Sequence, residues 1–381
     1  MRILMVSIPS IHFFRWVSQL QDSGYEVYWF DITGMSKHSD RINWVSQQTN
    51  WKMKWDFLGR TFLKVKFPVV YKSIQKINEK DVAKEFEKYL FQVQPDIVHS
   101  FALQLSCLPI LNVMNENPKI KWAFSSWGSD IFYSKQIGIN DNDLRKCFKR
   151  IDYLITDCTR DFNIATEKGF RKIFLGVFPG NGGVDFFTAK ISPVEERKII
   201  LIKGYNDKIG RGLNIVKALD QELIALLKEY EVIIFGADEL IKKYIEENSN
   251  FKKLKFTIYL KKDFIPNADL ISLMGKSLIY VANSLSDGIP NSLIEAMGMG
   301  AFPIQSNPGK VTEEIIEHGR NGFLIDDPEN LYEIKKSIIA VLKNEKMIKD
   351  ALKYNKENVR DKYNRQKVKK QILNLYEEIA C

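Results

Sequence analysis

Short apolar runs alternate with segments of helical periodicity along the first half of the chain. The apolar run at residues 2–7 predicts a strand, and residues 11–23, which end before a glycine, predict a helix. Residues 41–75 show no regular pattern, and we expect an irregular segment there. The other expected strands lie at 25–31, 96–100, 121–126 and 153–157, and the other helices at 81–94, 141–150 and 161–168. Such alternation is typical of a parallel sheet with helices on both faces.

The pattern breaks at residues 178–198, where Gly and Pro occupy four of the first six positions. We place an interdomain linker there. A second alternation follows. Its expected strands lie at 198–203, 231–236, 255–259, 278–281, 301–305 and 322–325, and its expected helices at 211–228, 239–247, 265–276, 291–298, 328–344 and 346–380.

The pattern therefore predicts an α/β protein with two Rossmann-like, doubly wound domains. We expect an N-terminal domain at 1–186, a C-terminal domain at 187–360 and a last helix at 361–381 that returns to the first domain. Open sheets of this kind bind ligands at the carboxyl ends of their strands. The cleft between the two domains is the expected active site.

The length and the cysteines agree with this prediction. At 381 residues the chain is longer than one typical domain. Its four cysteines have neither metal-ligand spacing nor a paired pattern, so we expect a reduced, cytoplasmic protein. The first ten residues, MRILMVSIPS, are expected to form a strand and not a signal peptide. No apolar run approaches the roughly 18–20 residues of a membrane-spanning helix.

The net charge of +9 is concentrated in part at residues 41–80, which hold nine Lys or Arg against two acidic residues. The same segment contains Trp44, Trp51 and Trp55. Basic and aromatic residues together can bind an anionic membrane surface. They can also bind nucleic acid, although no nucleic-acid motif supports that alternative. A solvated helix face with its aromatics in the core is the third interpretation.

The most informative segment is 278–309, LIYVANSLSDGIPNSLIEAMGMGAFPIQSNPG. An apolar strand ends in a turn that contains Asp287, and a short helix opens at about Asn291 and contains Glu295. The unpaired N–H groups of a helix N-terminus attract anions. Carboxylates beside such a site suit a ligand that carries both phosphates and hydroxyls, such as a sugar nucleotide.

Other motifs narrow the chemistry. The loop after the first strand lacks G-x-G-x-x-G, which weighs against an NAD or FAD enzyme, and the chain has no Walker A sequence. In KGYNDKIGRG, Lys208 and Arg211 lie where a loop of the second domain would meet a diphosphate. A solvated basic turn is the alternative.

In the first domain, Asp130 in WGSDIF follows an expected strand and could orient a hydroxyl or stabilise positive charge. An Asx turn or a helix cap would explain it equally well. His12 could face the cleft, although a histidine at a strand-to-helix boundary is more often a cap or a packing residue. We interpret His99 as structural.

With these residues in place, the chain resembles the retaining GT-B glycosyltransferases of family 4. The resemblance is strongest from 265 to 326 and weaker from 95 to 219. The family signature E-x7-E reads Asp287 to Glu295 here. FPGNGGVDFF resembles the family's P-N-G-V-D segment, and KIGRG resembles its basic K-G loop.

The resemblance implies a role for each matching residue. Glu295 would bind the donor ribose and Asp287 the hydroxyls of the donor sugar, while backbone amides at the start of the helix hold the diphosphate. Together with the residues proposed from their positions, the candidate catalytic residues are Asp130 and Asp287, the candidate acceptor-binding residues are His12 and Trp127, and the candidate donor-binding residues are Gly204, Lys208, Arg211, Asn291, Ser292, Leu293 and Glu295. Most enzymes of this family work without a catalytic metal, so we expect no metal or other cofactor.

Three positions depart from the family pattern. The first signature acid is Asp287, whose side chain is one methylene shorter than glutamate. Many members have His-Gly where this chain has Trp127-Gly128. The usual Gly-Arg before the basic loop reads Gly204-Tyr205, which places more of the phosphate contact on the downstream basic residues.

The sequence therefore predicts a retaining, metal-independent glycosyltransferase. It would move a sugar from a nucleotide-diphosphate sugar to a glycan or lipid-linked saccharide in surface polysaccharide synthesis. We expect a cytoplasmic protein that contacts the inner membrane face through residues 41–80 and binds no nucleic acid. Two alternatives stay open: a non-catalytic sugar-nucleotide-binding subunit and a sugar-nucleotide epimerase of the same fold.

Overall fold

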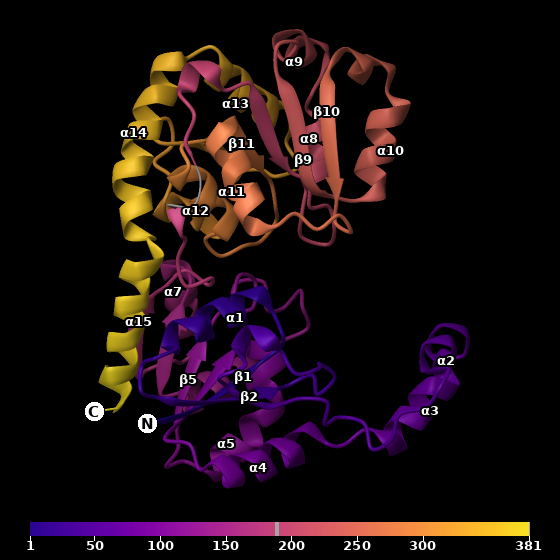
Figure 1. Cartoon of the computed structure of the whole chain (residues 1–381), viewed down its shortest axis with the longest axis vertical. Helices are drawn as coiled ribbons and strands as arrows, with labels where there is room; N and C mark the ends of the chain where they lie inside the picture. Colours follow the sequence, from indigo (N-terminus) through magenta and orange to yellow (C-terminus); the bar gives the residue numbers. More distant parts are fainter. Residues whose placement is uncertain (187–189, 381) are drawn as a thin grey trace. The chain divides into compact units, whose positions relative to one another are not determined.

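The computed structural model describes residues 1–186 and 190–380, which form two compact units (Figure 1). Unit 1 contains residues 1–157 and 161–182 together with the chain from Gln371 onward. Unit 2 contains residues 158–160 and the chain from Gly183 to Lys370. Each unit is built on one parallel sheet with helices, which confirms the predicted α/β class.

The sheet of unit 1 has seven parallel strands in the order β3-β2-β1-β4-β5-β6-β7. Its interior strands are buried on both faces, as expected when helices cover a parallel sheet on both sides. The strands are β1 (Arg2–Ser7), β2 (Glu26–Asp31), β3 (Ser46–Gln48), β4 (Ile97–Phe101), β5 (Lys121–Ser125), β6 (Tyr153–Thr156) and β7 (Ile173–Val177). The helices are α1 (Ile11–Val17), α2 (Arg60–Lys66), α3 (Pro68–Asn78), α4 (Val82–Val93), α5 (Leu111–Glu116), α6 (Asp141–Arg150) and α7 (Thr159–Glu167).

Local signals explain where several of these helices begin and end. The Asp81 side chain accepts a hydrogen bond from the Lys84 amide and caps α4, which ends at Gln94 in a left-handed conformation before Pro95. The prediction of an irregular segment at 41–75 was wrong, because this range contains β3, α2 and most of α3. Val70, Ile74 and Ile77 recur at helical spacing in α3, although neither helix buries an apolar stripe.

The sheet of unit 2 has six parallel strands in the order β10-β9-β8-β11-β12-β13. The strands are β8 (Ile199–Lys203), β9 (Glu231–Ala237), β10 (Lys255–Leu260), β11 (Ser277–Ala282), β12 (Phe302–Ser306) and β13 (Phe323–Ile325). The helices are α8 (Gly212–Lys217), α9 (Gln221–Leu226), α10 (Glu239–Glu247), α11 (Asn267–Lys276), α12 (Asn291–Gly298), α13 (Leu331–Leu342) and α14 (Glu345–Lys362). The helix predicted at 211–228 is divided into α8 and α9 because Asp220 caps a new helix start.

The last helix, α15 (Arg365–Ala380), packs on unit 1 through its final turns, as predicted. The Tyr376 hydroxyl accepts a hydrogen bond from Trp16 Nε1 at 3.2 Å and lies 2.6 Å from His99 Nδ1. Burial lowers the pKa of His99 to about 3, so its ring is neutral and bridges Tyr376 and Ser125. Among the residues that the structure describes, no helix is long and apolar enough to cross a bilayer.

A buried arginine fixes the turn between α12 and β12 in unit 2. The Arg197 guanidinium is 2% exposed and donates hydrogen bonds to the carbonyl oxygens of Ser192, Ser277 and Gly300. Gly300 has a φ of 77°, a left-handed conformation that favours glycine. Arg197 therefore ties the end of α12 to the start of β11.

We expect Arg197→Met to lower the free energy of unfolding by about 2–4 kcal/mol, because it leaves buried carbonyl oxygens without a donor. Urea unfolding followed by circular dichroism measures this loss. The control is Arg320→Met, which removes an exposed arginine that pairs with Glu317 on the surface. Equal stability of the two variants would contradict the structural role of Arg197.

Candidate functional site

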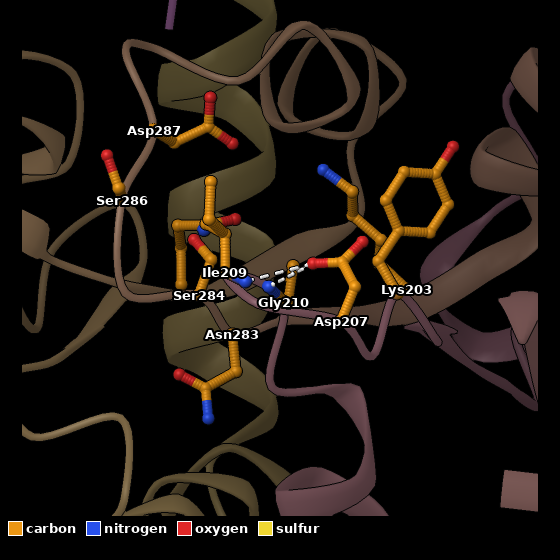
Figure 2. A pocket seen from close by; sticks show the side chains of 11 residues that line it. Lys203, Asp207, Ile209, Gly210, Asn283, Ser284, Ser286 and Asp287 are labelled. Atoms are coloured by element: carbon orange, nitrogen blue, oxygen red, sulfur yellow. Dashed lines mark hydrogen bonds between the residues drawn. The ribbon is translucent and has the colours of Figure 1, made fainter. Parts of the chain in front are cut away.

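A cavity of about 170 Å³ lies in unit 2 at the carboxyl ends of β8 and β11 (Figure 2). These strands are neighbours in the sheet, and the strand order reverses between them, so their loops leave in different directions. Such a switch point is where open α/β sheets bind ligands. The cavity is lined by Lys203, Tyr205, Asp207, Ile209, Gly210, Ala282, Asn283, Ser284, Ser286, Asp287 and Gln305.

Lys203 and Asp287 bring opposite charges into this cavity (Figure 2). Burial raises the pKa of Asp287, while the Lys203 ammonium, the Gly288 amide and the Arg160 guanidinium act in the opposite direction. Arg160 also holds the loop, because it donates to the carbonyl oxygens of Asp287 at 2.9 Å and Pro308 at 2.8 Å. The sequence prediction included Asp287 but missed Lys203, the last residue of a buried strand.

The loop after β8 is shaped by glycines and by Asp207. The Asp207 carboxylate accepts hydrogen bonds from the amides of Ile209 at 3.0 Å and Gly210 at 2.8 Å (Figure 2). These two amides and the nearby Lys261 lower the pKa of Asp207, against the opposing effect of partial burial. A Cβ on Gly204 would lie 2.6 Å from Ile234 Cγ2, so Gly204 permits close packing beneath the loop. Gly204, which was predicted to bind the donor, therefore shapes the loop through its backbone and has no side chain to offer a ligand.

The two predicted phosphate-binding cations lie on the same loop, but within the described chain neither belongs to the cavity lining. Lys208 is exposed. Arg211 forms an ion pair with Glu329 and donates to the carbonyl oxygens of Asp207 at 3.1 Å and Gly210 at 3.0 Å. The Arg211 guanidinium is therefore committed to protein partners in this conformation.

The N-terminus of α12 lies near Tyr280, whose hydroxyl contacts the predicted residue Ser292. Pro290 occupies the N-cap of α12 and has no side-chain acceptor. The Leu293 amide donates a hydrogen bond to the Pro290 carbonyl oxygen at 3.0 Å. The Tyr280 hydroxyl donates to Ser292 Oγ at 2.9 Å. Burial, followed by the charges of Asp287 and Glu295, raises the pKa of Tyr280 far above its ordinary range, although the Ser292 bond opposes this.

The Glu295 carboxylate lies further along α12 and is 4% exposed. It accepts a hydrogen bond from Asn267 Nδ2 of α11 at 3.1 Å. Asn267 was not predicted as a site residue. The predicted residues Asn291, Ser292, Leu293 and Glu295 thus lie on one short helix that begins close to Asp287.

A second cavity, of about 520 Å³, shares Tyr205 and Asp207 with the first. The Tyr205 ring lies against Gly236, where a Cβ would come within 2.1 Å of a ring carbon. The ammonium groups of Lys203 and Lys261 lie 5.0 and 5.1 Å from the centre of the same ring. The cavity is lined by Tyr205, Asp207, Phe235, Gly236, Leu260, Lys261, Asp263, Phe264, Ile265 and Leu270.

In unit 1, the structure brings the predicted residues His12, Trp127 and Asp130 together. The rings of His12 and Trp127 meet edge to face with their centres 6.0 Å apart. The Asp130 amide donates to the Trp127 carbonyl oxygen at 3.3 Å. The three residues come from the start of α1 and the loop after β5, at the carboxyl end of the sheet.

Asp130 is a buried carboxyl group with an unusual environment. Burial and the negative charge of Asp161 raise its pKa to about 8, against the opposing effect of backbone amides. One of those amides belongs to Leu103, which donates to Asp130 Oδ2 at 2.9 Å. The preceding residue, Ala102, has a φ of 66°, a strained conformation for a residue with a Cβ. Asp130 is therefore mostly protonated at neutral pH.

Comparisons with known proteins agree with this geometry. Residues 185–358, which contain both cavities, match the family model for glycosyl transferases group 1. This match confirms the predicted resemblance to that group. An uncharacterized glycosyltransferase of Methanocaldococcus jannaschii is 27% identical over 268 residues, which cover 65% of this chain and 62% of the relative. The chain thus spans less than two thirds of that relative's length.

Two solved structures match nearly the whole chain. Sucrose-phosphate synthase from Thermosynechococcus elongatus has a TM-score of 0.69 at 13% identity, covering 99% of this chain and 98% of that one. HepE of Anabaena, solved in complex with UDP-glucose, has a TM-score of 0.68 at 13% identity, covering 99% of this chain and 100% of that one. These likenesses show the fold and confirm the predicted GT-B architecture.

The burial of Asp130 predicts a pH-dependent stability. Between its ordinary pKa of 3.8 and its folded pKa of about 8, the unfolded carboxyl ionises while the folded one stays neutral, so folding loses stability as pH rises. An asparagine side chain at this position cannot ionise. We expect Asp130→Asn to gain stability over the parent as pH increases, on the order of 2–5 kcal/mol at pH 8 and little near pH 4.

Urea unfolding of both proteins across this pH range measures the difference. Glu116→Gln, which replaces an exposed acid of unit 1, is the control. A difference between Asp130→Asn and the parent that does not change with pH would show that Asp130 has an ordinary pKa.

Proposed function

We propose that this protein, whose residues 185–358 match the family model for glycosyl transferases group 1, transfers a sugar from a nucleotide-diphosphate sugar to a hydroxyl acceptor. The observation that carries the proposal is a pair of adjacent cavities in unit 2 that share Tyr205 and Asp207. The smaller one is lined mainly by polar and charged residues, and the larger one combines aromatic and apolar residues with Asp207, Lys261 and Asp263. A sugar diphosphate suits the first cavity and a nucleoside suits the second.

Lys203 is the residue that we propose contacts the diphosphate. The family's Gly-Arg reads Gly204-Tyr205 here, so the cation expected after the strand is missing. Lys203 lies two residues earlier and lines the cavity itself. An ammonium group there provides the charge-assisted hydrogen bond that the absent arginine would make.

Lys208 and Arg211 remain proposed contacts of the outer phosphate oxygens. For Arg211 this requires an exchange of partners, because Glu329 accepts from its guanidinium in the present conformation. A doubly charged diphosphate competes with one carboxylate for the same donors. Binding of the donor would then release Glu329, which also accepts from Asn214 at 2.7 Å.

The proposed reaction is retaining and independent of metal. No protein nucleophile is required if the acceptor hydroxyl attacks on the face from which the diphosphate leaves, and the leaving phosphate takes its proton. The developing negative charge would be stabilised by Lys203 and by the N-terminal amides of α12. Asp287 would hold the hydroxyls of the donor sugar, and Glu295 those of the ribose.

The acceptor is proposed to be a glycan or a lipid-linked saccharide in surface polysaccharide synthesis. His12 and Trp127 of unit 1 form an aromatic and imidazole surface that suits a sugar ring. Asp130, three residues after Trp127, would orient the acceptor hydroxyl. Its neutral carboxyl group can donate a hydrogen bond as well as accept one.

The role of Lys203 is tested by donor binding. We expect Lys203→Met to weaken binding of a nucleotide diphosphate about 10–100-fold, since one charge-assisted hydrogen bond contributes about 1.5–3 kcal/mol. Calorimetric titration with UDP, GDP and ADP measures affinity and base preference, with UDP tested first because HepE was solved with UDP-glucose.

Lys228→Met, at an exposed position after α9, is the matched control and should bind as the parent does. The variants Lys208→Met and Arg211→Met measure, in the same titration, how much each of the other two cations contributes to the affinity for nucleotide diphosphate. Unchanged affinity in Lys203→Met, with an unchanged melting temperature, would remove Lys203 from the site.

The reaction itself is tested by the release of nucleotide diphosphate. We expect release to rise at least about tenfold when a saccharide acceptor is added, to persist in EDTA, and to give a product with the anomeric configuration of the donor. A sugar-nucleotide-binding subunit would release nothing, and an epimerase would change the sugar without acceptor. Either result would contradict transfer.

A further inference from the structure

We propose that residues 57–78, here called the arm, dock the protein on an anionic lipid bilayer. The arm comprises α2 and α3, which lie against each other and project from unit 1 (Figure 1). The inference depends on the surface of the arm and stands without the proposed transfer reaction.

The arm exposes apolar side chains that have no core to join. Every residue of α2 is described and none of them is buried, while in α3 the buried positions are the polar residues Gln75 and Asn78. Apolar side chains along the arm are more than half exposed, among them Leu58, Phe62, Val65, Phe67, Val69 and Val70. Apolar side chains exposed together on two adjacent helices mark a site that binds a partner or a membrane.

The charge of the arm is of one sign. Residues 57–78 contain five Lys or Arg and no Asp or Glu. Lys64, Lys66, Lys72 and Lys76 are all exposed. The partner must therefore combine negative charge at its surface with an apolar interior, which is the chemistry of a bilayer that contains anionic lipids.

The arm is held in a defined position at its base. The Lys54 amide donates to the Asn78 carbonyl oxygen at 2.8 Å, and the Lys80 amide donates to the Lys52 carbonyl oxygen at 2.8 Å. The Asn78 side chain closes the base further through two hydrogen bonds with the Trp55 backbone, at 3.0 and 2.9 Å. The apolar residues are thus presented by folded helices.

The structure also changes which residues of the basic segment contact lipid. Trp51 is 4% exposed and stacks on Phe30 in the core of unit 1. Trp51 is therefore not part of the membrane surface, whereas Trp55, next to the base of the arm, is 46% exposed. Aromatic Phe62 and Phe67 are exposed on the arm, but most of its exposed apolar side chains are aliphatic and cannot stack on bases, which favours lipid over nucleic acid. Two copies of an arm with the same charge would repel each other.

Vesicle flotation of the whole 381-residue chain tests the inference. The vesicles contain phosphatidylcholine alone or phosphatidylcholine with one third phosphatidylglycerol. We expect the parent to float with the anionic vesicles and to stay in solution with the neutral ones. The double variants Phe62→Ser/Val69→Ser and Lys66→Gln/Lys72→Gln should each reduce the bound fraction about tenfold.

The matched control is Lys252→Gln/Lys253→Gln, which removes two exposed lysines from unit 2 and should bind as the parent does. Circular dichroism and donor binding should be unchanged in every variant, which separates failure of docking from failure of the proposed reaction. Equal binding by the parent and the arm variants would overturn the inference. So would a dimer or an oligonucleotide complex that forms in place of vesicle binding and is lost in the same variants.

Discussion

The reversal of strand order between β8 and β11 is the constraint on which the site in unit 2 depends. Neighbouring parallel strands lie about 4.8 Å apart, yet the loops that follow these two strands leave in different directions and cannot fill the space between them. Lys203 ends β8, and Asp287 lies in the loop after β11, so the same geometry that opens the cavity also places opposite charges in it. The helix that follows, α12, then begins beside that cavity. Position in the sheet thus determines which side chains can meet a ligand.

Lys203, Asp207 and Asp287 place three charged groups around one small cavity, and buried charges need opposite charges or hydrogen bonds nearby. Asp287 is stabilised as a carboxylate by Lys203, by the Gly288 amide and by Arg160, although burial acts against it. Arg211 and Glu329 form an ion pair beside the neighbouring loop, so each charge has an opposite partner. Each of these pairs includes a group that, under the proposed function, would bind the sugar diphosphate. In unit 1, Asp130 is compensated differently, because its carboxyl group keeps its proton.

Much of the fold could be predicted from local sequence, because both sheets are built from short apolar runs separated by helices. The elements around Asp287 and Glu295 could also be predicted, because the turn, the helix and its glycines are contiguous in the sequence. Lys203 was missed because a basic residue at the end of a buried strand has no signal of its own. The Arg211–Glu329 pair joins residues 118 positions apart, so no local pattern predicts it. The helices of the arm were missed although Val70, Ile74 and Ile77 recur at helical spacing in α3, because basic and apolar residues alternate closely through α2 and obscure the period.

We propose that the cavity between the β8 and β11 loops holds the diphosphate of a sugar nucleotide. A crystal structure of the protein with bound UDP tests this proposal. We expect diphosphate oxygens within hydrogen-bond distance of Lys203 Nζ and of the first amides of α12, with Arg211 released from Glu329. A diphosphate bound elsewhere, with Lys203 still facing Asp287 in an empty cavity, would contradict it.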